Sequence, residues 1–236
     1  IAQPFDTRTH ELTGEPFRVV APASSPELTS AGGFAVSASA AGSLAFRQIL
    51  PSKKRLIWFD RSGKELARID DAGDIANPSL SPDGRLLLIR RIVDGVADTW
   101  ILDLTRGVWT PTSAAGTQAV WSPDGRRMAF YRTSQGASDL FVKPIGSDRA
   151  GEELVLSTPE LKSMQDWSPD GRFLVYQSES PARNSGLDVW VLPLEGFRKP
   201  VAFAQTRFEE KNPKVSPDAK WIAYESNESG RFEIYL

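Results

Sequence analysis

The chain of 236 residues contains no cysteine and a single histidine, His10. The absence of cysteine excludes disulfide bonds, thiolate metal ligands and a cysteine nucleophile. A Ser-His-Asp triad needs a histidine positioned by a carboxylate, whereas His10 stands in a polar segment near the amino terminus. The Gly-x-Ser-x-Gly motif of serine hydrolases is also missing. The sequence therefore predicts a protein without catalytic residues.

Long apolar runs and blocks of like charge are missing as well. No stretch approaches the roughly 18 apolar residues of a membrane-spanning helix. The 28 basic and 30 acidic residues are interleaved, and no basic stripe is present to neutralise phosphates. These features exclude nucleic acid as a partner and membrane insertion by this segment. The chain begins at Ile1 and shows no signal peptide, so we expect a segment of a longer protein.

A four-residue motif repeats along the chain. Ser-Pro-Asp-Gly occurs at 81–84, 122–125 and 168–171, Ser-Pro-Asp-Ala at 216–219, and a degenerate Ser-Ala-Ala-Gly at 39–42. The last residues of these copies are 42, 41, 46 and 48 residues apart, which is close to the period of β-propeller blades. An aromatic residue follows each copy, sixteen to nineteen positions after its last residue: Trp58, Trp100, Phe141, Trp190 and Tyr235.

Between these markers, short segments rich in β-forming residues are separated by polar turns. We expect second strands at 86–91, 128–132, 173–177 and 221–225, third strands at 100–104, 141–145 and 190–194, and fourth strands at 108–111, 153–156 and 200–203. A short first strand precedes each Ser-Pro, and no segment has sustained helical periodicity. The pattern predicts an all-β propeller of four-stranded blades, with four whole repeats and split half-blades at the two ends.

We expect residues 1–236 to form a single propeller domain or a fragment of one. The repeat periods are 34–75, 76–116, 117–162 and 163–210, with partial blades at 1–33 and 211–236. Either the ends share one blade in a five-bladed ring, or the chain is an incomplete arc of a larger propeller. We favour the arc, because closure usually shares strands between the ends rather than splitting one strand. An uncapped arc exposes strand edges, so self-association through them is expected.

The repeated motif has the chemistry of a tight turn. Proline presets φ at the first corner, aspartate accepts hydrogen bonds from nearby backbone N–H groups, and glycine adopts the left-handed conformation. We therefore assign a structural turn role to Asp83, Gly84, Asp124, Gly125, Asp170, Gly171 and Asp218. Ala219 replaces the last glycine, so that turn is expected to be strained or different. One aspartate per blade cannot supply the converging oxygens of a calcium site, so no metal or cofactor is expected.

Two copies carry a longer match. Trp121-Ser-Pro-Asp-Gly-Arg126 is followed by Asp139-Leu-Phe141, and Trp167-Ser-Pro-Asp-Gly-Arg172 is followed by Asp188-Val-Trp190. These segments resemble the WD40-like PD40 repeat of TolB and of the propellers in tricorn protease and the prolyl oligopeptidases. The resemblance covers about residues 34–236. It implies a propeller that scaffolds or binds proteins, with a protein partner that it does not identify.

A narrower resemblance connects Ile1–Asp6, Leu12–Pro16 and Leu56–Gly63 with the carboxy-terminal propellers of certain bacterial serine/threonine protein kinases. The glycine-rich loop and the His-Arg-Asp motif of the kinase domain itself are missing. This resemblance implies a non-catalytic sensor or scaffold within a larger bacterial regulatory or envelope protein. It also favours a periplasmic or extracytoplasmic location.

In propellers, ligands usually meet the loops before the innermost strands, which surround the channel. Here those loops contain the candidate site residues Asn77, Gln118, Gln165, Asp166 and Asn212. Amides donate and accept hydrogen bonds without charge, which suits a peptide backbone or a sugar. In the alternatives, these side chains bond one another or channel water, or the mouth senses a small ligand. A further alternative is a glycosidase or lactonase that uses channel carboxylates, for which the cluster Asp70, Asp71 and Asp74 is the candidate, with a solvated turn as the simpler interpretation.

Overall fold

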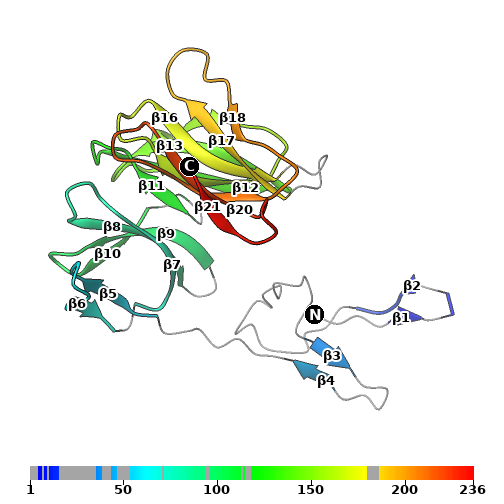
Figure 1. Ribbon diagram of the computed structural model, residues 1–236. Coiled ribbons are helices and arrows are strands. Elements are labelled where there is room, and N and C mark those ends of the chain that lie inside the picture. The colour runs from blue at the N-terminus through cyan, green and yellow to red at the C-terminus, as the bar shows by residue number, and fades with distance from the viewer. Residues whose placement is uncertain are drawn as a thin grey trace. The chain divides into compact units, whose positions relative to one another are not determined.

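The computed structural model describes residues 5–6, 8–9, 11–15, 36–38, 44–46, 54–70, 72–93, 96–112, 114, 118–179 and 186–236. Within these ranges the regular structure consists of strands, apart from one 3-10 helix, η1 (Arg149–Gly151). The predicted all-β class is confirmed (Figure 1). The chain divides into two compact units, Ile1–Gly73 and Asp74–Leu236. The division falls close to the border expected between the repeats 34–75 and 76–116.

Among its described residues, the first unit contains three antiparallel strand pairs. They are β1 (Phe5–Asp6) with β2 (Glu11–Leu12), β3 (Val36–Ala38) with β4 (Leu44–Phe46), and β5 (Leu56–Phe59) with β6 (Glu65–Ile69). Two of the connecting turns have the same design, since an aspartate Oδ1 accepts a backbone N–H two residues later. Asp6 accepts from Arg8 at 2.8 Å, and Asp60 accepts from Ser62 at 2.8 Å. The degenerate motif at 39–42 lies outside the described residues.

In the part of the second unit that the structure describes, there are three antiparallel four-stranded sheets and one three-stranded sheet, each built from consecutive strands (Figure 1). The first sheet comprises β7 (Asp74–Leu80), β8 (Leu86–Val93), β9 (Val96–Asp103) and β10 (Val108–Pro111). The second comprises β11 (Ala119–Trp121), β12 (Arg127–Ser134), β13 (Ala137–Pro144) and β14 (Glu153–Leu156). The third comprises β15 (Lys162–Trp167), β16 (Phe173–Glu179), β17 (Leu187–Pro193) and β18 (Val201–Ala204). The last comprises β19 (Glu210–Val215), β20 (Ile222–Ser226) and β21 (Glu233–Tyr235), and these sheets are the blades that the repeat predicts.

Observed strands extend further into their hairpins than the apolar pattern indicates. The third strand expected to begin at Phe141 begins at Ala137. It pairs with β12 from Arg127↔Pro144 to Ser134↔Ala137, so the ladder runs through polar residues up to the tight turn. Backbone hydrogen bonds maintain this pairing without apolar side chains, which is why the sequence pattern underestimates strand length.

The blades stack face to face around an apolar core. Leu88 packs with Met128 and Phe130 of the next blade, and all three are at most 1% exposed. Ala129 and Leu140 pack in turn with Leu174 of the third blade, and Val175 packs with Ile222 of the last. Successive residues of a strand point to opposite faces, so the second and third of these blades each contact the blades on both sides. Burial of each large side chain contributes about 1.5–3 kcal/mol.

Candidate functional site

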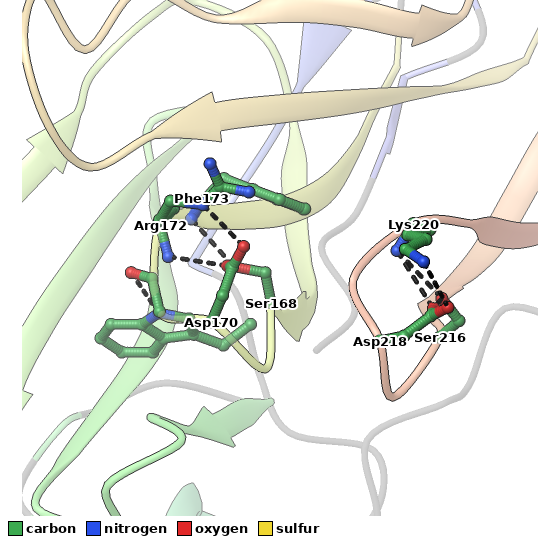
Figure 2. A network of polar contacts seen from close by, with 9 residues as sticks. Ser168, Asp170, Arg172, Phe173, Ser216, Asp218 and Lys220 are labelled. Carbon is green, nitrogen blue, oxygen red and sulfur yellow. Dashed lines mark hydrogen bonds and ion pairs between the residues drawn. The ribbon is translucent and has the colours of Figure 1, made fainter.

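Each Ser-Pro turn is held by the same small network of hydrogen bonds. In the first copy Ser81 Oγ donates to Asp83 Oδ1 at 2.6 Å and accepts from the Leu86 N–H at 2.9 Å. Asp83 Oδ1 also accepts from the Arg85 N–H at 3.1 Å. The copies at 122, 168 and 216 repeat the serine–aspartate bond at 2.5, 2.7 and 2.6 Å. Figure 2 shows the last two of these turns.

The network lowers the pKa of each turn aspartate. The serine hydroxyl is the main cause, and the backbone N–H two residues after the aspartate is the second. The pKa of Asp170 falls to about 2, mainly through the Ser168 hydroxyl and the Arg172 N–H, and the Arg172 side chain adds a bond from Nε to Oδ2 at 2.6 Å. The hydrogen bonds of the folded turn therefore stabilise the ionised form of each aspartate. The carboxylates bond to groups of their own blades.

The last turn keeps this geometry although it lacks glycine. Gly84, Gly125 and Gly171 have φ of 70°, 67° and 76°, and Ala219 has a φ of 57°. Ser216 Oγ and Asp218 Oδ1 both accept from the Lys220 N–H at 3.2 Å (Figure 2). An alanine in the left-handed region is strained, so the last copy retains its turn at an energetic cost.

A cavity of about 370 Å³ lies where the first strands of the blades run into these turns. We call it the turn-side pocket. Three prolines of successive turns, Pro82, Pro123 and Pro169, line it. Leu80, Trp121 and Trp167, each directly before a turn serine, also line it. Its lining combines these apolar side chains with polar and charged ones, and several blades of the second unit supply it.

The two tryptophan side chains are buried in the blade packing and form a fixed part of the pocket lining. Trp121 and Trp167 are 6% and 4% exposed. Trp121 Nε1 donates to the Ser79 carbonyl of the preceding blade at 2.8 Å, which fixes the indole between blades. Leu80, in contrast, is 51% exposed and presents apolar surface to a ligand.

Asp166 and Lys214 supply the charged groups of the turn-side pocket. Asp166 Oδ1 accepts from the Trp167 N–H and Oδ2 from the Val215 N–H of the next blade, both at 3.0 Å. Lys214 Nζ donates to the Gln165 carbonyl at 2.6 Å. Both side chains thus connect neighbouring blades while they border the pocket.

Of the five residues predicted at the channel mouth, Asp166 lines the turn-side pocket. Asn77 and Asn212 are exposed, each has a φ of 53°, and each occupies a bulge of its first strand just before a proline. Gln118 is half-buried. Gln165 is 5% exposed, and its Nε2 donates to Ser163 Oγ at 3.1 Å.

Asn212 is the most bonded of these amides. Its backbone N–H donates to Gln177 Oε1 and its Nδ2 donates to Glu225 Oε1, both at 3.0 Å. The pocket residues Leu80 and Lys214 were not singled out from the sequence. Their position in the repeat could have identified them, because each stands one or two residues before a turn serine.

The carboxylates of Asp70, Asp71 and Asp74, which were the alternative site, do not form a cluster among the residues that the structure describes. Asp70 is exposed and lies 3.6 Å from Arg55 Nε and 3.8 Å from an Arg68 nitrogen. Asp74 begins β7, and Asp71 lies outside the described residues. Within the described ranges no group of three or more acidic or histidine side chains could hold a metal ion, and no helix is long and apolar enough to cross a membrane.

Comparisons with known proteins agree with this architecture. The chain is 26% identical over 212 residues to the uncharacterized peptidase YuxL of Bacillus subtilis, which is 70% of this chain and 32% of YuxL. It is 27% identical over 109 residues to the Tol-Pal system protein TolB of Anaeromyxobacter dehalogenans, which is 44% of this chain and 24% of that protein. It thus spans about a third or less of these relatives.

The crystal structure of TolB from Acinetobacter baumannii superimposes with a TM-score of 0.65 at 16% identity, covering 78% of this chain and 46% of that one. At this identity the likeness concerns the fold. A family model described as the TolB beta propeller domain, PD40, matches residues 61–236. Because that match covers most of the sequence, the chain belongs to the PD40 family of TolB beta propeller domains.

Proposed function

We propose that this propeller is a non-catalytic protein-interaction module, part of a larger bacterial regulatory or envelope protein. Its turn-side pocket would bind an extended segment of a partner protein. The observation that carries the proposal is the pocket itself, which has exposed Leu80, rigid indoles and prolines from three turns. Its volume, about 370 Å³, lies within the range of roughly 300–1,000 Å³ found for ligand pockets.

The charges of the pocket define the partner more closely. An apolar side chain of the bound segment would pack on Leu80 and the prolines. Within the described part of the chain, Lys214 Nζ uses one of its three N–H groups, on the Gln165 carbonyl, so it can also donate to a carbonyl or carboxylate of the partner. We expect bound segments to combine an apolar or aromatic residue with a nearby acceptor, which gives both affinity and orientation.

The amides three or four residues before the turn serines extend this proposal. Asn77, Gln118 and Asn212 stand four residues before their turn serines, and Gln165 stands three before. A partner that continues along the channel would meet Asn77 and Gln118 first, because they are less buried than Gln165. Gln118→Ala should weaken partner capture without a change in melting temperature. Unchanged capture would show that this amide takes no part in binding.

The main test is selection of peptides from a displayed random library on the purified chain. Leu80→Asp should abolish binding of the selected peptides, because it places a charge on the apolar wall. Leu154→Asp is the matched control, since Leu154 is 53% exposed and Leu80 51%, and Leu154 lies on β14 away from the pocket. If both variants bind equally well, or neither does, the turn-side pocket is not the binding site.

A second candidate function is the propeller of a peptidase, which the match with YuxL favours. In that case the same pocket would receive substrate peptides, and catalysis would belong to another part of the protein. Incubation of the chain with quenched fluorescent peptides is expected to give no hydrolysis. Hydrolysis that persists through repurification would overturn the non-catalytic assignment.

A further inference from the structure

A second cavity lies between two blades of the second unit, apart from the turn-side pocket. It measures about 240 Å³ and opens between β10 of the first blade and the turn that follows β13 of the second. We call it the inter-blade crevice. Ile101, Pro111 and Met128 contribute apolar surface, and Lys143 and Asp148 contribute charge. It shares no residue with the turn-side pocket, so it is an independent site.

Lys143 is the unusual residue of the crevice. It is 1% exposed, and within the described part of the chain its Nζ makes one hydrogen bond, to the Thr112 carbonyl at 2.8 Å. Lys162 shows how the same fold satisfies a buried ammonium, because its Nζ donates to the carbonyls of Ser138, Thr158 and Glu160. Lys143 therefore retains N–H donors beside the crevice that Lys162 does not.

The surrounding charges leave Lys143 available to an anion. Burial lowers the pKa of Lys143, while the carboxylates of Glu152 and Asp148 act in the opposite direction. Glu152 is already paired with Arg132, at 2.9 Å. An incoming carboxylate would stabilise the charged form of Lys143, because an opposite charge close to an ammonium raises its pKa.

Asp148 provides the complementary charge at the rim. It is exposed, its Oδ1 accepts from the Ala150 N–H at 3.0 Å, and it takes part in no ion pair with another described residue. A ligand with an anionic and a cationic end could thus bind Lys143 with the first and Asp148 with the second. The apolar surface between them would accept a hydrocarbon side chain of moderate size.

We propose that the inter-blade crevice binds a free α-amino acid with an apolar side chain. The α-carboxylate accepts from Lys143 Nζ, the α-ammonium donates to Asp148, and the side chain packs on Ile101, Pro111 and Met128. The volume of about 240 Å³ suits one such molecule and excludes a folded segment of a protein. The site would allow the propeller to respond to a small metabolite independently of its protein partner.

Isothermal titration of the chain with L-leucine, up to about 10 mM, tests the proposal. We expect saturable binding of one molecule per chain. Leucinamide, which lacks the carboxylate, and 4-methylpentanoate, which lacks the ammonium, should each bind about tenfold more weakly, since each loses one charged hydrogen bond. An absence of leucine binding, or equal binding of leucinamide, would overturn the proposal.

Three variants locate the site. Lys143→Met should abolish leucine binding, and Asp148→Asn should weaken leucine but leave 4-methylpentanoate unchanged. Thr110→Trp should block the crevice while Lys143 stays in place, because Thr110 is an exposed strand residue on its lining. Lys220→Met, at an exposed lysine outside the crevice, is the control and should bind as the parent does. Leucine binding that survives both Lys143→Met and Thr110→Trp would place the ligand elsewhere and refute the assignment.

Discussion

Substitution of Ala219 by glycine should stabilise the protein. Ala219 has a φ of 57° in a turn whose other copies place glycine there. An L-residue in the left-handed region carries strain of about 1–2 kcal/mol. Glycine removes this strain but gives the unfolded chain more freedom, which offsets about 0.4–1 kcal/mol. The expected net gain in the free energy of unfolding is about 0.5–1 kcal/mol.

The matched variant is Gly171→Ala, which makes the same exchange in the opposite direction. Gly171 has a φ of 76°, and a Cβ added there would meet no heavy atom within 4 Å. The cost of that alanine is therefore conformational rather than steric. We expect it to lower stability by about the amount that Ala219→Gly raises it.

Scanning calorimetry or thermal circular dichroism would measure both effects. For a domain of this size, a change of about 1 kcal/mol shifts the melting temperature by about 2–4 °C. The reasoning is refuted if Ala219→Gly lowers the melting temperature, or if Gly171→Ala leaves it unchanged. In either case the left-handed conformation would not be the source of strain in these turns.

Three further predictions concern buried or ionised groups. The pKa of Asp170 is lowered to about 2, so its contribution to stability is present above pH about 4 and disappears as the pH falls towards 2. Asp170→Asn should therefore be less stable than the parent in urea unfolding near neutral pH, with the difference shrinking in acid; a constant difference would contradict this. Trp121→Phe should lose about 1–3 kcal/mol in the same assay, because the Ser79 carbonyl loses its donor between blades. Lys162→Met should destabilise more than Lys143→Met, because it leaves three carbonyls without a donor instead of one. Equal losses for the two lysine variants would show that the carbonyl bonds do not determine the effect.

The blades were predictable from the sequence because their turns depend on local chemistry. Serine, proline and aspartate stand within four consecutive residues in all four turns of the second unit, and glycine follows in three of them, so the pattern is visible without any tertiary information. The fourth strands expected at 108–111 and 153–156 lie where they were predicted. They are short and bounded by turns on both sides, which leaves little freedom in their placement.

The features that depend on distant parts of the chain were not predictable in this way. The burial of Lys162 depends on the carbonyl of Ser138, 24 residues earlier in β13, together with the nearby carbonyls of Thr158 and Glu160, and nothing in its own sequence distinguishes it from a surface lysine. The turn-side pocket likewise needs residues from several blades at once. Asp166 was predicted from its position in a loop, whereas Leu80 and Lys214 gain their significance from neighbours more than thirty residues away.

The repeat also indicates where binding specificity can change. The serine and aspartate of each turn are engaged in the hydrogen bonds that form it, and the proline presets φ at its corner, so substitutions there would disturb the fold. The residue directly before the serine differs among the copies: Leu80, Trp121, Trp167 and Val215. Three of these four residues line the turn-side pocket. Trp121 and Trp167 belong to the buried core, whereas Leu80 is 51% exposed, so a substitution at position 80 can alter the proposed binding surface without disturbing the fold.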